Sequence, residues 1–108
     1  MNHNEQKQHV EDFLEKIRQM ILKKGDDYSN QDRLSTFKLA GAITGLDARM
    51  ICVNQIAIKV SRLGVLVGSG KSSEYESLRD SILDLASYAV LLDQILCDED
   101  KVDSERFW

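Results

Sequence analysis

The spacing of apolar residues predicts two helices in the first half of the chain. Over residues 5–24 the apolar side chains recur at intervals of three and four, which places them along one stripe of a helix: Val10, Phe13, Leu14, Ile17, Met20 and Ile21. Gly25 is the expected stop, followed by a polar loop over 26–32. A shorter helix is expected over 35–44, ended by Gly45, with these residues inward: Phe37, Ala40 and Ile43.

Two longer helices are predicted in the second half. The segment 47–67 is apolar on nearly every side, so it is expected at the centre of the fold or between subunits, with Asp47 as its N-cap. A fourth helix is predicted over 73–97, where Ser73 and Glu76 have the spacing of a capping box. The pattern therefore predicts an all-α, four-helix bundle-like domain over 1–97 and an acidic C-terminal tail over 98–108 that ends in Phe107-Trp108.

Composition and charge narrow the class of protein. The chain has 108 residues, no proline and 43% apolar residues, which suits one helical core and excludes large catalytic architectures. Its net charge of −4 disfavours a nucleic-acid polymer or an anionic membrane as partner. Cys52 and Cys97 lie in apolar helical pattern and are expected to be buried thiols. With a polar N-terminus, these features favour a cytoplasmic protein.

Two polar stripes carry the candidate chemistry. Gln55, Lys59 and Arg62 recur at intervals of four and three on the apolar third helix. Glu76, Asp80 and Asp84 recur at intervals of four on the fourth. An antiparallel pairing of these helices would set the cations opposite the carboxylates. Such an arrangement is either an ion-pair network that fixes the helix register or a site that holds phosphate or metal.

Two sequence motifs bear on nucleotide chemistry. Gly70-Lys71-Ser72 matches the end of a phosphate-binding loop, but Val65 stands where that motif needs glycine, so Lys71 is retained only as a candidate phosphate ligand at a helix N-terminus. A magnesium site can draw Glu76, Asp80 and Asp84 from the fourth helix. The third helix has no carboxylate after Asp47, so Asp26, Asp27 or Asp32 would have to complete the site from the loop.

Four segments resemble a known group of proteins: Lys24-x-x-Asp27-Tyr28-Ser29, Phe37-Lys38-x-Ala40, Lys59-Val60-Ser61-Arg62-Leu63 and the run from Glu76 to Ala89. They are similar to small helical proteins of tailed phages and prophages described as nucleotide-modification-associated, a group similar in turn to the MazG-like all-α nucleotide pyrophosphohydrolases. The resemblance covers about residues 20–96. It implies a four-helix core, assembly into dimers or larger oligomers, and a nucleotide-related ligand. The glutamate pair of the MazG pattern is missing from the third helix.

These observations lead to three functional hypotheses. The first is a cytoplasmic, homo-oligomeric protein that binds a phosphorylated nucleotide or nucleotide-derived signal without hydrolysing it, and thereby sequesters a host defence messenger. In it Lys59 and Arg62 contact phosphate, Tyr28 or Tyr88 stacks on a base, and Asp80 and Asp84 orient the cations; no cofactor is needed. The second is a Mg²⁺-dependent nucleoside triphosphate pyrophosphohydrolase. The third is a structural helical oligomer with internal ion pairs.

Overall fold

The fold is all-α. The structure, a computed structural model, describes residues 1–27, 33–70 and 75–99. These residues form α1 (His3–Asp27), α2 (Arg33–Thr44), α3 (Ala48–Ser69) and α4 (Tyr75–Glu99), and no strand occurs among them. The helical class predicted from the apolar spacing is confirmed.

Local chemistry explains where α2 ends and α3 begins. Asp47 has extended backbone angles, and its side chain accepts a hydrogen bond of 2.8 Å from the backbone N–H of Arg49, so the predicted N-cap is confirmed. Gly45 has a φ of 78°, which only glycine adopts at little cost, and it ends α2 as expected. Gly70 similarly closes α3 in the left-handed conformation. The turn between α2 and α3 is thus specified by a few residues.

Helices α1 and α4 both extend past their predicted C-terminal ends. Helix α1 continues through Gly25 to Asp27, so the prediction of a stop at Gly25 is wrong. A single glycine inside a helix costs only about 1 kcal/mol, less than a long helix gains from continuing. Helix α4 runs to Glu99, past the expected boundary at 97. Ser73 of the expected capping box and the terminal Phe107-Trp108 lie outside the described residues.

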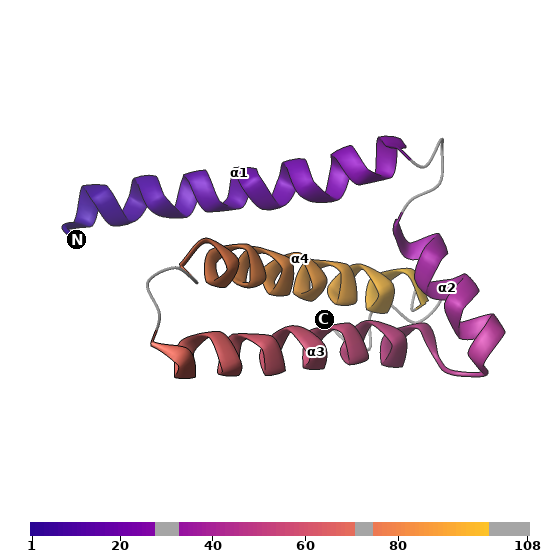
Figure 1. Cartoon of the computed structure of the whole chain (residues 1–108). Helices are drawn as coiled ribbons and strands as arrows, with labels where there is room; N and C mark the ends of the chain where they lie inside the picture. The colour runs from indigo at the N-terminus through magenta and orange to yellow at the C-terminus, as the bar shows by residue number, and fades with distance from the viewer. Residues whose placement is uncertain (28–32, 71–74, 100–108) are drawn as a thin grey trace.

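The helices form an antiparallel pair with two additions (Figure 1). Helices α3 and α4 lie side by side along most of their length, and they make the most extensive helix contact in the described structure. Helix α1 runs along α4, while the short α2 crosses one end of the pair. Ser87 on α4, which is 2% exposed, donates a hydrogen bond of 3.2 Å to the sulfur of Met20 and so joins α1 to α4.

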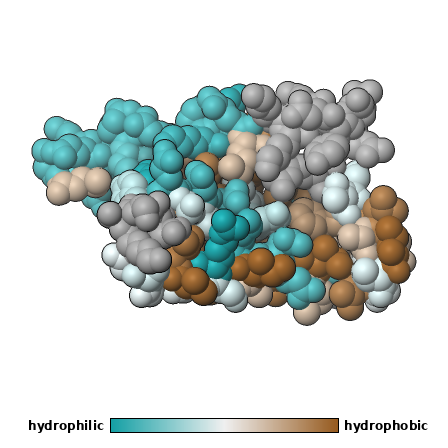
Figure 2. Space-filling view, viewed as in Figure 1, coloured by the Kyte–Doolittle hydropathy of each residue, from teal (hydrophilic) through white to brown (hydrophobic). Residues whose placement is uncertain are grey.

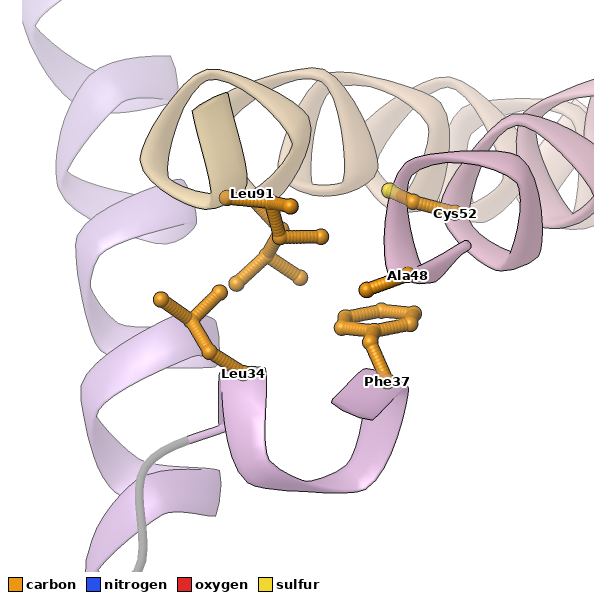
Figure 3. Close-up of a cluster of buried hydrophobic side chains, with 6 residues drawn as sticks. Leu34, Phe37, Ala48, Cys52 and Leu91 are labelled. Carbon is orange, nitrogen blue, oxygen red and sulfur yellow. The ribbon is translucent and has the colours of Figure 1, made fainter. Parts of the chain in front are cut away.

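The hydrophobic core lies at the corner where α2 meets the α3–α4 pair (Figure 3). The buried members of this core are Leu34, Phe37, Ala48, Cys52, Leu91 and Ile95. The Phe37 ring meets the Tyr88 ring edge to face, with 6.3 Å between centroids. The Cys52 thiol donates a hydrogen bond of 3.4 Å to the Tyr88 carbonyl, which fixes α3 against α4. The core therefore joins three helices at one end of the molecule.

Several apolar residues expected inside lie at the surface. Val10 and Leu14 on α1 are about half exposed, and Ile43 on α2 is 75% exposed. Cys97 is also exposed, so the prediction of two buried thiols is correct only for Cys52. Helices α1 and α2 contact the α3–α4 pair less extensively than α3 and α4 contact each other, and the spacing of apolar residues does not reveal how much of a stripe is covered.

Helix α3 also keeps an apolar surface. Figure 2 shows hydrophobic residues gathered along the α3 side and at α2, whereas the α1 side is hydrophilic. Among the described helices, α3 alone is long and apolar enough to cross a membrane by length and composition, a test that core helices of soluble proteins also pass. What covers this helix is therefore a central question about the protein.

Candidate functional site

The two polar stripes meet at one ion pair between α3 and α4. The ammonium nitrogen of Lys59 lies 3.1 Å from Oδ2 of Asp84. The Lys59 side chain is 21% exposed and the Asp84 side chain 31% exposed, so most of each side chain is covered by the two helices. A charge placed this way loses part of its hydration, and the opposite charge beside it offsets that loss.

Further polar side chains lie one helical turn away from this ion pair, on the same two helices. Gln55, half-buried, lies one turn before Lys59 on α3. Arg62 and Asp80 are exposed, and each lies about one turn beyond the ion pair in the same direction because the two helices run antiparallel. No ion pair joins Arg62 to Asp80 or Glu76 within the described part of the chain. The expected opposition of charges is therefore realised at Lys59 and Asp84, and beyond it the charged groups are open to solvent.

None of the remaining predicted site residues is shown at the charged stripe. Tyr28 and Lys71 lie outside the described residues, so the structure gives no account of either. Tyr88 is half-buried, and its ring packs on Phe37 of the core. That contact gives the Tyr88 ring a packing role and leaves it poorly placed to stack on a base. Among the described residues the charged stripe itself is thus the surviving candidate.

The carboxylates of α4 are not arranged around one point. Residues four apart on a helix are separated by about 6 Å along its axis, so Glu76 and Asp84 stand about 12 Å apart along α4. Mg²⁺ needs oxygen ligands that converge at about 2 Å. Across residues 1–27, 33–70 and 75–99, no three His, Cys, Asp or Glu side chains gather as a metal-binding group. Asp84, moreover, already faces the Lys59 ammonium.

A groove between α1 and α4 was not predicted from the sequence. It has a volume of about 230 Å³ and is lined by His9, Phe13, Arg79 and Ile82. The His9 and Phe13 rings stack with 6.3 Å between centroids, and the Arg79 guanidinium lies over the Tyr75 ring at 5.8 Å. Both pairs have the four-residue spacing that brings helical side chains together, which is the signal that could have revealed them.

Two further ion pairs link or cap helices. Lys38 on α2 pairs with Asp98 on α4, a contact over 60 residues of sequence that spacing does not indicate. Asp47 binds the Arg49 guanidinium through both carboxylate oxygens, at 2.7 and 3.0 Å. The Arg49 side chain and backbone N–H together lower the pKa of Asp47 from 3.8 to about 2. Both pairs serve the fold, since each fixes a helix end.

Comparison with known proteins identifies no relative of this chain. The chain has no significant match among protein family models, curated proteins or solved structures.

Proposed function

We propose that the protein binds a phosphorylated nucleotide, or a nucleotide-derived signal, at the charged stripe between α3 and α4, and does not hydrolyse it. The observation that carries the proposal is the Lys59–Asp84 pair at 3.1 Å, set largely out of water in an apolar helix pair. An apolar pair could hold the helices equally well, because an ion pair that loses part of its hydration is often no more stabilising than its apolar replacement. A charge kept at this place is better accounted for by a ligand that needs it.

The chemistry of the stripe suits a phosphate. An arriving phosphate can take the place of the Asp84 carboxylate beside Lys59, because both present oxygen atoms to the ammonium. Arg62, exposed on the next turn, can reach a second oxygen, and guanidinium groups bind phosphate in a bidentate manner. Gln55 and Asp80 offer an amide and a carboxylate to the sugar or base. The motif resemblance between residues 59 and 89 favours the same ligand class.

A binding role also accounts for the carboxylates better than hydrolysis does. Metal-dependent hydrolysis would require several oxygen ligands around one Mg²⁺ ion. Glu76, Asp80 and Asp84 lie in a row along one helix, and the facing positions of α3 are amide or cationic. Asp84 therefore acts by orienting Lys59, and the other carboxylates act by accepting hydrogen bonds from the ligand. We further propose that the binding protein is a cytoplasmic homo-oligomer.

Calorimetric titration with nucleotides tests the proposal. The wild-type protein is titrated with the common NTPs, dNTPs and cyclic dinucleotides, and the probe that binds most tightly is used for the variants. Lys59→Ala with Arg62→Ala should lower the affinity at least about 100-fold, as expected when two charge-assisted contacts are lost. Lys16→Ala with Arg18→Ala on the exposed face of α1 is the matched control, since it removes the same charge.

The outcomes separate the three hypotheses. Loss of affinity in the stripe variant alone, with helical circular dichroism retained, supports the site. Equal affinity of both variants would refute the assignment to Lys59 and Arg62. Absence of binding across the whole panel would favour the structural hypothesis. Release of phosphate or pyrophosphate in the presence of Mg²⁺ would overturn the non-hydrolytic part of the proposal.

A further inference from the structure

Helix α3 carries a second apolar stripe that the core does not use. Its members recur at alternating intervals of three and four over almost five turns: Met50, Val53, Ala57, Val60, Gly64 and Val67. All six are exposed, and the four larger side chains are between 39% and 65% exposed. In helices that pack along one another, residues at these alternating intervals form the line of contact, which we call the seam. The stripe lies on a different face from Cys52 and Lys59, which contact α4.

We propose that the stripe binds the same stripe of a second copy of this chain, with the two α3 helices antiparallel across a twofold axis. The proposal gives a surface to the self-association included in the proposed function, and it does not depend on nucleotide binding. In a twofold pair one patch meets itself, so a single seam of six residues is enough to build the whole interface.

The order of large and small residues selects the antiparallel arrangement. When the two seams are centred on each other, Val53 lies opposite the partner subunit's Gly64, and Ala57 lies opposite the partner subunit's Val60. At these inner layers a valine faces a small residue, and at each end of the seam Met50 meets the partner subunit's Val67. A parallel, in-register pair would set glycine against glycine and alanine against alanine, which leaves gaps at both layers. A Cβ added to Gly64 meets nothing within 4 Å in the single chain, so this face is open.

A second copy is a better occupant than a lipid bilayer. Although α3 has the length and composition of a membrane span, Lys59 lies at its middle and is bound to Asp84 of α4. Inserting α3 would carry this pair and the neighbouring Arg62 into hydrocarbon, where charged side chains are strongly disfavoured. The dimer, in contrast, buries a seam without charged members. Arg62 projects from the opposite side of α3, so both nucleotide sites stay open in the dimer.

A pair of valine substitutions tests the interface by light scattering and sedimentation. Val60→Glu puts a carboxylate into the seam, and Val65→Glu is the matched control on the same helix, at a 73% exposed position outside the seam. Wild type and Val65→Glu should have twice the 12.3 kDa chain mass or a multiple of that dimer. Val60→Glu should raise the dimer dissociation constant on the order of 100-fold, because its charge would be buried without a partner.

Disulfide trapping tests the orientation in a Cys97→Ser background, which removes the exposed native thiol. Met50→Cys and Val67→Cys proteins should form a disulfide when mixed and oxidised, while neither should cross-link efficiently alone. Cross-linking of either protein with itself would instead indicate a parallel pair and overturn the proposed orientation.

The failures of the two proposals are distinguishable. A Val60→Glu monomer that still binds nucleotide supports the interface and leaves the binding site intact. A wild-type monomer at micromolar concentration would overturn self-association, and a Val60→Glu protein that dimerises like wild type would overturn this interface. Wild-type flotation with phosphatidylcholine vesicles, lost in Val60→Glu, would assign the stripe to a membrane instead.

Discussion

The Lys59–Asp84 pair gives the sharpest stability prediction, through a double-mutant cycle of Lys59→Met, Asp84→Asn and both together. At 3.1 Å and an effective dielectric constant of about 20, the attraction between two unit charges is about 5 kcal/mol. Loss of hydration offsets most of it, because the side chains are only 21% and 31% exposed. We expect a net coupling energy of about 1–2 kcal/mol, above the range of about 0.2–1 kcal/mol for exposed pairs.

The cycle is measured by urea unfolding, followed by circular dichroism at one fixed protein concentration, because self-association would shift the apparent stability. Each single variant should lose about 2 kcal/mol, since it leaves the partner's charge without an opposite charge in a largely covered position. The double variant should lose less than the sum of the two. Additivity is the usual result for residues that do not interact, so the deviation measures the pair itself.

The exposed pair of Glu15 and Arg18 on α1 is the control. Its atoms lie at a similar distance, 3.3 Å, but its side chains are 52% and 65% exposed. The same cycle there should give a coupling energy below about 0.5 kcal/mol, and salt near 1 M should reduce it further. Equal coupling energies at the two pairs, or a value near zero for Lys59 and Asp84, would contradict the prediction that lower exposure strengthens the coupling.

Three other predictions concern the fold. Gly41→Ala should destabilise the protein by about 1–3 kcal/mol in urea unfolding, because its Cβ would come within 2.5 Å of the Leu46 carbonyl oxygen. Leu91→Ala, at a position 1% exposed, should cost about 2–5 kcal/mol and lower Tm by at least about 8 °C. Because Arg49 lowers the pKa of Asp47 to about 2, this cap stabilises the fold above pH 4 and loses its effect as the pH falls toward 2. The Tm difference between wild type and Asp47→Asn should therefore narrow over that range.

Each of these predictions has a control. Gly68→Ala meets nothing within 4 Å and should not reproduce the loss seen at Gly41. Val90→Ala, next to Leu91 but 37% exposed, should cost less than the change at the buried leucine. Other carboxylates titrate in both wild type and Asp47→Asn, so their contribution cancels in the difference. A Tm difference that stays constant from pH 6 to pH 2 would contradict the assigned pKa.

Much of the fold could be predicted because it is local. The N-cap at Asp47 and the glycine at position 45 each act on a neighbouring turn, so their chemistry can be recognised in the sequence. The end of α1 could not be predicted the same way. Gly25 permits a stop, yet the helix continues to Asp27 because one glycine costs too little to end it.

The candidate site was only partly predictable, for a related reason. Helical spacing shows that Lys59 and Asp84 project toward neighbouring stripes, but the register that brings them within 3.1 Å depends on how α3 and α4 slide together. Arg62 and Asp80 belong to the same stripes and remain at the surface. The contact between Lys38 and Asp98 has no periodic signal, since it joins two different helices.

The presence of four helices and the positions of their charges can be recognised in the sequence, because both depend on spacing within one segment. Which apolar face of α3 is covered depends on how the helices pack. Cys52 faces α4 in the core, while Val60 and the rest of its stripe stay exposed. The physical reason is that α3 is apolar nearly all round, so periodicity cannot rank its faces, and only packing against α4 makes the choice.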